Sequence, residues 1–398
     1  MSDCFAIELA KLKMTGVSII GVGMTKFGER WDKGLRELMA EAGVKAIIDA
    51  GVDGPDIDAV YGGCMSAGRL TGQEHIGALI ADQSGLNPIP ATRVEAACSS
   101  GGLAMREAVL SILSGEHDVV IAGGVEKMSD VEVSQVTTTL GGAADLEWES
   151  SLGATFPALY ALIARRHMYE YGTTEEQMAA VAVKNHDNGS LNPYAQYQYK
   201  VTLEQVMNSS PIATPLKLLD CSPVTDGAAA VILARDTVAK KYSDHPIRIL
   251  ASSQASDTLS LHDRASLTEL TATKHAAAHA FERAKLKPKD IDIAEVHDCF
   301  TIAEILAIED LGFFKKGEGG KATEKGLTAR DGQVAINTSG GLKACGHPVG
   351  ATGIKQAVEI AWQLRGEAGK RQVKDAKIGL THNVGGSGAT CVVHILSK

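Results

Sequence analysis

The chain has 398 residues, a formal net charge of −9 at pH 7 and seven scattered cysteines without a C-x-x-C pair. A chain of this length is too long for one small hydrophobic core and suits two packed halves. Its negative charge argues against nucleic-acid binding. The cysteines argue against a disulfide scaffold or structural zinc and indicate reduced thiols in the cytoplasm. No apolar run approaches transmembrane length, and residues 1–13 lack a signal-peptide core, so we expect a short disordered or dispensable extension there.

The chain begins as an alternation of strands and helices. Apolar runs predict strands at Val17–Val22 and Ile57–Tyr61, and we expect helices at Leu35–Ala50 and His75–Gly85. This alternation is typical of a mostly parallel sheet whose faces are covered by helices. The sequence therefore predicts the α/β class, which also suits its 42 glycines and few aromatic residues.

A cysteine stands at the centre of the next unit, which reads strand, turn, helix, strand. Val94–Ala97 predicts a short buried strand, and Cys98 follows it directly. The Ser-Ser-Gly-Gly stretch after Cys98 permits a sharp turn into a helix, and Val119–Val125 is the next strand. A helix N-terminus stabilises a thiolate, so we expect a nucleophile of low pKa. The alternative is a small buried thiol with a packing role.

The alternation is interrupted from about residue 130 to residue 225. Polar, glycine-containing stretches surround two predicted helices, Phe156–Tyr171 and Thr174–Asn185, before the core strand Gly227–Ala234. A segment of this length is too long for a simple connection, and such insertions commonly form the ligand-binding side of a protein. We therefore expect an inserted loop domain over 130–225.

The second half of the chain repeats the first in order and spacing. Asp56–Val60 reads DIDAV and Asp290–Val296 reads DIDIAEV, and a cysteine follows each within a few residues. We expect two similar halves with the site between them, over 14–129 plus 226–240 and over 241–398. The alternative is a chance similarity of ordinary β-α-β units. The elements predicted in this half are Ile247–Ala251, Ala272–Lys285, Asp290–Val296, Val334–Ser339, Ile354–Leu364, Lys377–Leu380 and Thr390–Leu396.

Four short motifs carry reactive side chains, and each lies at the end of a predicted strand. They are A-C-S-S-G around Cys98, H-D-C-F from His297, C-G-H-P-V-G-A-T-G around His347 and H-N-V-G-G from His382. A cysteine nucleophile needs a base beside it and hydrogen-bond donors for the oxyanion of the attacked thioester. Two histidines and glycine-rich turns with exposed N–H groups can supply both. His347 is the stronger candidate for the catalytic base, because a histidine with a merely structural role is not expected in a turn between glycine and proline.

These motifs resemble those of the thiolase family, and the resemblance extends from about Met14 to Lys398. The stretch Gly346–Gly353 is highly specific for that family. The H-D-C-F and H-N-V-G-G motifs resemble the sterol-carrier-protein-type and archaeal acetoacetyl-CoA branch, whereas most thiolases carry N-E-A-F and C-x-G-G-G there. The resemblance implies a thiolase fold, in which two similar β-α-β repeat halves form five layers, αβαβα, with an inserted loop domain.

The resemblance implies a role for each of the central residues. Cys98 takes the acyl group from acyl-CoA, and His347 accepts the proton of its thiol. His297 stands where most thiolases have an asparagine that holds an oxyanion water, so it is expected to donate to the thioester oxygen. The backbone N–H groups of Cys98 and Val384 would form a second oxyanion hole.

The second acid/base is open between two residues. His382 occupies the position of the usual second catalytic cysteine, and Cys299 lies two residues after His297, on the same side of an extended chain. We favour Cys299, because imidazole already occurs twice in the set and a thiol adds the missing function. The implied reaction is the Claisen condensation of two acetyl-CoA to acetoacetyl-CoA and CoA, with no metal and no tightly bound cofactor.

The phosphates of CoA need basic partners in this acidic chain. The insertion offers Lys217, Lys184, Arg165 and Arg166, and thiolases bind CoA on that side. Ordinary solvated surface charge is the alternative for each of these four residues.

The resemblance also implies partners and a setting. We expect a homodimer or a tetramer, associated with HMG-CoA synthase through a small zinc-ribbon/OB-fold protein, at the cytoplasmic entry to the mevalonate pathway and isoprenoid synthesis. No nucleic acid and no membrane are expected to take part. The alternatives are a degradative 3-ketoacyl-CoA thiolase and a non-catalytic thiolase-like scaffold or lipid carrier.

Overall fold

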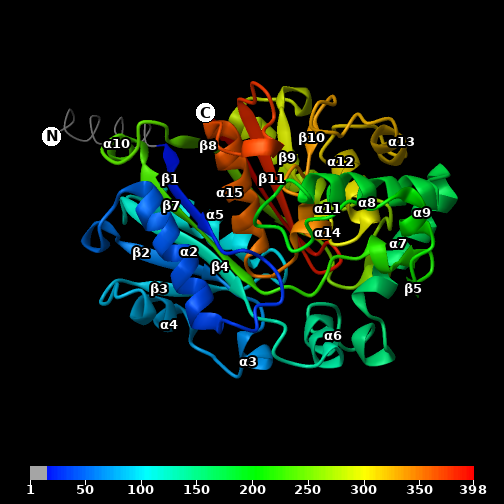
Figure 1. Cartoon of the computed structure of the whole chain (residues 1–398), viewed down its shortest axis with the longest axis horizontal. Coiled ribbons are helices and arrows are strands. Elements are labelled where there is room, and N and C mark those ends of the chain that lie inside the picture. The colour runs from blue at the N-terminus through cyan, green and yellow to red at the C-terminus, as the bar shows by residue number, and fades with distance from the viewer. Residues whose placement is uncertain (1–15) are drawn as a thin grey trace.

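A ten-stranded mixed sheet forms the centre of the computed structural model, which describes residues 16–398; the predicted extension over 1–13 therefore lies outside the described residues (Figure 1). The strands of this sheet are β1 (Val17–Met24), β2 (Ala59–Gly63), β3 (Ala91–Val94), β4 (Val119–Glu126), β7 (Gly227–Arg235), β8 (Ile247–Ser256), β9 (Ile293–Glu295), β10 (Ala335–Ile336), β11 (Ile378–Gly385) and β12 (Thr390–Ser397). A separate ribbon pairs β5 (Pro211–Ala213) with β6 (Leu216–Lys217).

The sheet confirms the predicted repeat. Its strand order is β10-β9-β11-β12-β8-β1-β7-β4-β2-β3, so each half contributes five strands arranged in mirrored order. In both halves the outer three strands are parallel and the inner pairings are antiparallel. The halves join where β1 pairs with β8 over only three residues, Val17–Ile19.

Helices cover the sheet in layers and also separate its halves. The helices are α2 (Leu35–Ala50), α3 (Ala67–Leu70), α4 (Ile76–Gln83), α5 (Ser100–Ser114), α6 (Val133–Gly141), α7 (Phe156–Tyr171), α8 (Glu175–Gly189), α9 (Leu203–Met207), α10 (Asp236–Ala239), α11 (Thr271–Ala284), α12 (Thr301–Asp310), α13 (Gly319–Glu324), α14 (Gly341–Cys345) and α15 (Thr352–Arg365). Helices α2 and α4 pack on the outer face of one half, and α11 and α12 on the outer face of the other. No helix of the described residues is long and apolar enough to cross a membrane.

The middle layer consists of α5 and α15, which lie between the two half-sheets (Figure 1). Apolar residues of both helices share one core with strands of both halves. Helix α15 buries 12 of its 14 residues, as a helix enclosed on all sides must. The predicted five-layer αβαβα arrangement is therefore confirmed.

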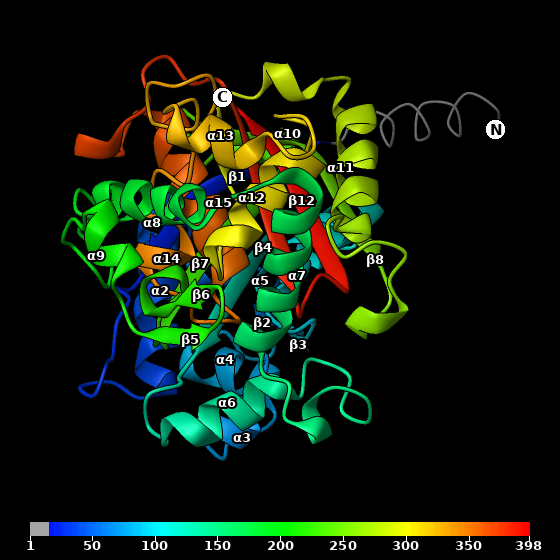
Figure 2. The same cartoon turned by 90° about the vertical axis from the view of Figure 1, so that its right-hand side faces the viewer.

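The insertion between β4 and β7 holds α6 to α9 and the small β5–β6 ribbon. Helix α7 has the predicted bounds, and α8 begins after Thr174, whose hydroxyl accepts the N–H of Gln177 at 3.3 Å. Apolar residues of α7 pack against α12 of the second half, where Leu159 and Ile163 join one core with Ile302 (Figure 2). The insertion therefore packs beside the segment that carries the H-D-C-F motif.

Candidate active site

A strained turn presents Cys98 in front of α5. The expected strand Val94–Ala97 is wrong in its bounds, because β3 ends at Val94 and the chain turns at once. Ala97 has a left-handed φ of 52°, and its N–H donates to the carboxylate of Glu95 at 2.6 Å. The hydroxyls of Ser99 and Ser100 donate to the carbonyls of Ala96 and Ala97, both at 2.6 Å. Strain of this kind persists where the surroundings fix it, and here it sets the position of the thiol.

Glycines bring the turn of Cys98 against the turn of His347. A Cβ atom on Gly353 would lie 2.1 Å from the backbone nitrogen of Gly102, and one on Gly101 would lie 2.6 Å from the carbonyl oxygen of Gly350. No side chain fits at these contacts, so the start of α5 and the start of α15 touch through their backbones. The glycines of the two motifs thus close the gap between the halves of the molecule.

Three predicted residues meet at this junction. The Sγ of Cys98 and one ring nitrogen each of His297 and His347 all lie within 4.8 Å of one another. The imidazole rings stand nearly perpendicular, with centroids 5.1 Å apart and planes at 85°. Both histidines are buried, whereas Cys98 keeps part of its surface open.

A threonine of the same motif orients His347. The hydroxyl of Thr352 donates to the carbonyl of Pro348 at 3.0 Å, so its oxygen accepts from Nδ1 of His347, 2.7 Å away. The proton of the neutral ring is therefore on Nδ1, and Nε2 keeps a lone pair. Burial lowers the pKa of His347 to about 3, so this imidazole is a neutral base before reaction.

His297 has the opposite arrangement of contacts. Its Nδ1 lies 3.2 Å from the side-chain nitrogen of Asn383, while its buried Nε2 has no hydrogen-bond partner among residues 16–398. Burial lowers its pKa well below the ordinary value, and the neighbouring His347 and His382 add to the shift. A neutral ring with one free nitrogen next to the thiol is suited to contact a reacting carbonyl oxygen.

The thiol of Cys98 differs from the expectation of a low pKa. Burial raises its pKa to about 12, although the backbone N–H groups of Gly386 and of Cys98 itself favour the thiolate. Desolvation thus outweighs the helix N-terminus, and the group at rest is a neutral thiol. The N–H of Gly386 faces this sulfur. Val384, the expected oxyanion donor, lies buried in β11 opposite Cys391, and its role stays a prediction.

Cys299 and His382 occupy different surroundings. Cys299 is buried, and burial, with Cys98 as the next cause, raises its pKa well above the ordinary value, whereas a hydrogen bond with Tyr160 opposes the shift. His382 is fully buried; its Nδ1 accepts the backbone N–H of His297 at 3.3 Å, and its Nε2 contacts the hydroxyl of Thr273 on α11 at 2.9 Å. Both ring nitrogens of His382 are therefore occupied, and the ring holds the backbone of His297 in place.

Tyr160 belongs to the site although no motif indicated it. This residue of α7 is buried, its ring lies 4.7 Å from that of Phe300, and its hydroxyl donates to the carbonyl of Gly386 at 3.3 Å. Burial raises the pKa of this phenol, and the neighbouring Cys299 adds to the shift. The insertion thus delivers one polar group to the two cysteines, and only tertiary packing reveals it.

The predicted CoA-binding cations differ in availability. Lys184 is partly buried and pairs with the buried Glu304 at 2.9 Å, and Lys217 pairs with Glu175, so neither presents a free ammonium. Arg166 pairs with Glu170 at 2.6 Å on the surface of α7. Arg165 is exposed on the same helix.

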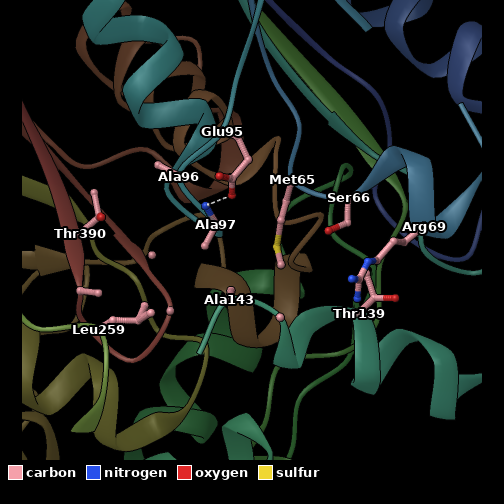
Figure 3. A pocket seen from close by; sticks show the side chains of 14 residues that line it. Met65, Ser66, Arg69, Glu95, Ala96, Ala97, Thr139, Ala143, Leu259 and Thr390 are labelled. Carbon is pink, nitrogen blue, oxygen red and sulfur yellow. Dashed lines mark hydrogen bonds between the residues drawn. The ribbon is translucent and has the colours of Figure 1, made fainter. Parts of the chain in front are cut away.

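A cavity of about 520 Å³ opens beside the cysteine turn, and Ala97 and Gly386 form part of its wall. Figure 3 shows Met65, Ala143 and Leu259 around it, with Arg69 on the side of α3 and α6. No sequence motif marks these lining side chains, because they come from distant parts of the chain. The cavity borders the turn that carries Cys98, although the side chains of Cys98, His297 and His347 do not line it.

Comparison with known proteins identifies the family. The model of the thiolase N-terminal domain matches residues 17–237, and that of the thiolase C-terminal domain-like family matches residues 253–398. The chain therefore belongs to the thiolase family and is an acyltransferase.

Individual relatives match over nearly the whole chain. It is 60% identical to an acetyl-CoA acetyltransferase of Methanothermobacter thermautotrophicus, over 97% of this chain and 100% of the relative. It is 55% identical to an acetyl-CoA acetyltransferase of Methanocaldococcus jannaschii, over 96% and 99%. Among solved structures, the Ltp2-ChsH2(DUF35) aldolase superimposes with a TM-score of 0.85 at 26% identity, over 96% of this chain and 97% of that chain.

Proposed function

We propose that this protein is an acetyl-CoA C-acetyltransferase, which condenses two acetyl-CoA to acetoacetyl-CoA and CoA through an acyl-cysteine at Cys98. The meeting of Cys98, His297 and His347 within 4.8 Å carries the proposal, because it places a nucleophile, a neutral base and a free imidazole nitrogen around one point. The two archaeal acetyl-CoA acetyltransferases support the choice of substrate.

The first half of the reaction acylates Cys98. The thiol gives its proton to Nε2 of His347 while its sulfur attacks the thioester carbonyl, so no free thiolate is needed at rest. Backbone N–H groups at Cys98 and in the Val384–Gly386 segment stabilise the oxyanion of the tetrahedral intermediate. The CoA thiolate leaves with the proton of Cys299, which then holds the negative charge.

The second half forms the carbon–carbon bond. The Cys299 thiolate removes a proton from the methyl group of the second acetyl-CoA, and its raised pKa makes it a strong base. The enolate oxygen is held by Nε2–H of His297, and the carbanion attacks the acyl group. Cys98 leaves and regains its proton from His347, so all protons are accounted for without a metal or a tightly bound cofactor.

Acetylation measured by mass spectrometry tests the first step. One acetyl group is expected on Cys98 after incubation with acetyl-CoA, none in Cys98→Ala and far less in His347→Ala. Acetylation that persists in Cys98→Ala contradicts the proposed nucleophile.

The choice between Cys299 and His382 is tested in the second step. We expect Cys299→Ala to be acetylated normally but to condense at least about 10²-fold more slowly, because the α proton loses its acceptor. His382→Ala should cost less, since both its ring nitrogens already hold structural contacts. Near-normal condensation by Cys299→Ala together with loss in His382→Ala reverses the assignment.

The principal alternatives are a degradative 3-ketoacyl-CoA thiolase and a scaffold or lipid carrier without turnover. The cavity of about 520 Å³ borders the turn of Cys98, which makes a longer acyl chain the first alternative to test. Condensation and thiolysis assays with acyl-CoA of two to sixteen carbons separate the three. The acetyltransferase prefers acetyl and acetoacetyl groups, and a scaffold gives no turnover with any.

We also propose a homodimer or tetramer that associates in the cytoplasm with HMG-CoA synthase and a zinc-ribbon/OB-fold protein, at the entry to the mevalonate pathway. Strand β3 supports self-association, because it is the last strand of the sheet and has no partner on its outer edge among the described residues. The similar Ltp2-ChsH2(DUF35) aldolase is named for two components, which supports a second protein. Light scattering and co-expression with size exclusion test these associations; a monomer at micromolar concentration contradicts the dimer.

A further inference from the structure

Asn383 holds three groups of the active site at once. This buried residue of β11 accepts the backbone N–H of Gly102 through Oδ1 at 3.1 Å. Its Nδ2 donates to the carbonyl of Cys98 at 3.0 Å. Because one partner only donates and the other only accepts, the orientation of the amide is fixed.

The remaining hydrogen of that amide points to His297. Nδ2 of Asn383 lies 3.2 Å from Nδ1 of the ring, and an amide nitrogen can only donate. Nδ1 must therefore accept, which places the proton of the neutral ring on Nε2. That nitrogen is buried and has no hydrogen-bond partner within residues 16–398. A ring nitrogen of His297 lies within 4.8 Å of the Sγ of Cys98 and of a ring nitrogen of His347, so this ring belongs to the cluster.

The same cluster has the composition of a zinc site. A cysteine and two histidines are common zinc ligands, and imidazole binds the metal through a nitrogen lone pair. Cys98 and Nε2 of His347 are free to ligate, but the lone pair of His297 faces Asn383 instead. In metal sites the second ring nitrogen usually donates to a carboxylate or carbonyl, which is the reverse of the contact seen here.

We propose that Asn383 is a positioning residue that holds His297 in the Nε2–H form, so that the cluster of Cys98, His297 and His347 stabilises an enolate or oxyanion and resists capture of a zinc ion. The catalytic part of this inference rests on the proposed function, whereas the metal part does not.

Substitution of Asn383 separates this role from a structural one. In Asn383→Asp the carboxylate accepts from Nδ1–H, and the lone pair moves to Nε2. We expect the affinity for Zn²⁺, measured by competition with a chromophoric chelator, to rise by about 10–100-fold. Condensation should fall by about 10²–10³-fold in metal-free buffer, because the donor is lost.

Asn383→Ala provides the second variant, since alanine neither donates nor accepts and leaves both tautomers accessible. Its zinc affinity and its condensation rate should both lie between those of the wild type and Asn383→Asp. Should Asn383→Asp fail to fold, an increase of zinc affinity in Asn383→Ala supports the proposal and an unchanged affinity overturns it.

Two controls exclude trivial explanations. Asn208→Asp adds the same charge at an exposed position and should leave zinc affinity and activity unchanged. Cys98→Ala combined with Asn383→Asp should lose the gained affinity, because the cluster is then incomplete. Zinc affinity that stays at the wild-type value in both single variants at Asn383, or a gain that survives without Cys98, overturns the proposal. If the wild type shows no condensation at all, the proposed function fails while the zinc measurements still decide the tautomer.

Discussion

Lys355 of α15 and Glu295 at the end of β9 form a buried ion pair that supports the active site. Nζ lies 2.8 Å from the carboxylate, and both side chains are almost fully buried, at 1% and 0% exposure. Glu295 also accepts the backbone N–H and the hydroxyl of Ser339 at 3.0 and 2.5 Å. Lys355→Met removes the cation and leaves the carboxylate charged in the core, at a cost of about 3–5 kcal/mol.

The size of the chain converts this cost to a melting shift. Unfolding entropy of about 2.1 cal/mol/K per residue gives roughly 0.8 kcal/mol/K for this chain, so the Tm should fall by about 4–6 °C. Lys355→Met combined with Glu295→Gln should recover most of the loss, because glutamine is neutral and still accepts from Ser339. Scanning calorimetry of both variants provides the measurement. A single variant that melts within 1 °C of the wild type, or a double variant no better than the single, refutes the reasoning.

Three other outcomes follow from the same contacts. Thr352→Val removes the acceptor of His347 Nδ1–H and should slow the acetylation of Cys98 by about 10–10²-fold. Thr352→Ser keeps the hydroxyl and should restore the rate, and mass spectrometry of quenched samples measures both. Burial alone would raise the pKa of Asp226, but hydrogen bonds from Lys127 and Ser129 outweigh it, so the pKa is lowered. The stability that the ionised Asp226 contributes to the fold is therefore present at neutral pH and is lost as the pH falls below about 4. Asp226→Asn should thus melt lower than the wild type at pH 7, and the gap should shrink at pH 3; an equal gap at both contradicts this. Because burial raises the pKa of Cys98 to about 12, its alkylation by iodoacetamide should quicken about tenfold per pH unit from 7 to 10, whereas a plateau near pH 7 would indicate a thiolate at rest.

Local signals account for the elements that were predicted best. Helices α2 and α7 have the expected bounds, since each ends at a glycine, Gly51 or Gly172, that adopts the left-handed conformation of a C-cap. The expected strand before Cys98 was too long, because the left-handed Ala97 ends pairing at Val94. A turn of that kind is not visible in an apolar run.

The candidate site was predictable only as far as short motifs reach. Three motifs named Cys98, His297 and His347, and the structure brings these residues together. The contribution of Tyr160 depends on how the insertion packs, and no local pattern marks it. The pKa of Cys98 was misjudged for a similar reason, since desolvation depends on neighbours from the whole fold.

The mirrored strand order divides the reactive groups between two units of one topology. The first half supplies the nucleophile of the cluster, and the second half supplies both imidazoles. Two units of the same topology therefore carry different reactive groups, at the Cys98 turn in one and at the His297 and His347 turns in the other. Neither half holds the complete cluster, so turnover depends on how the two halves pack against each other as well as on the reactive groups themselves.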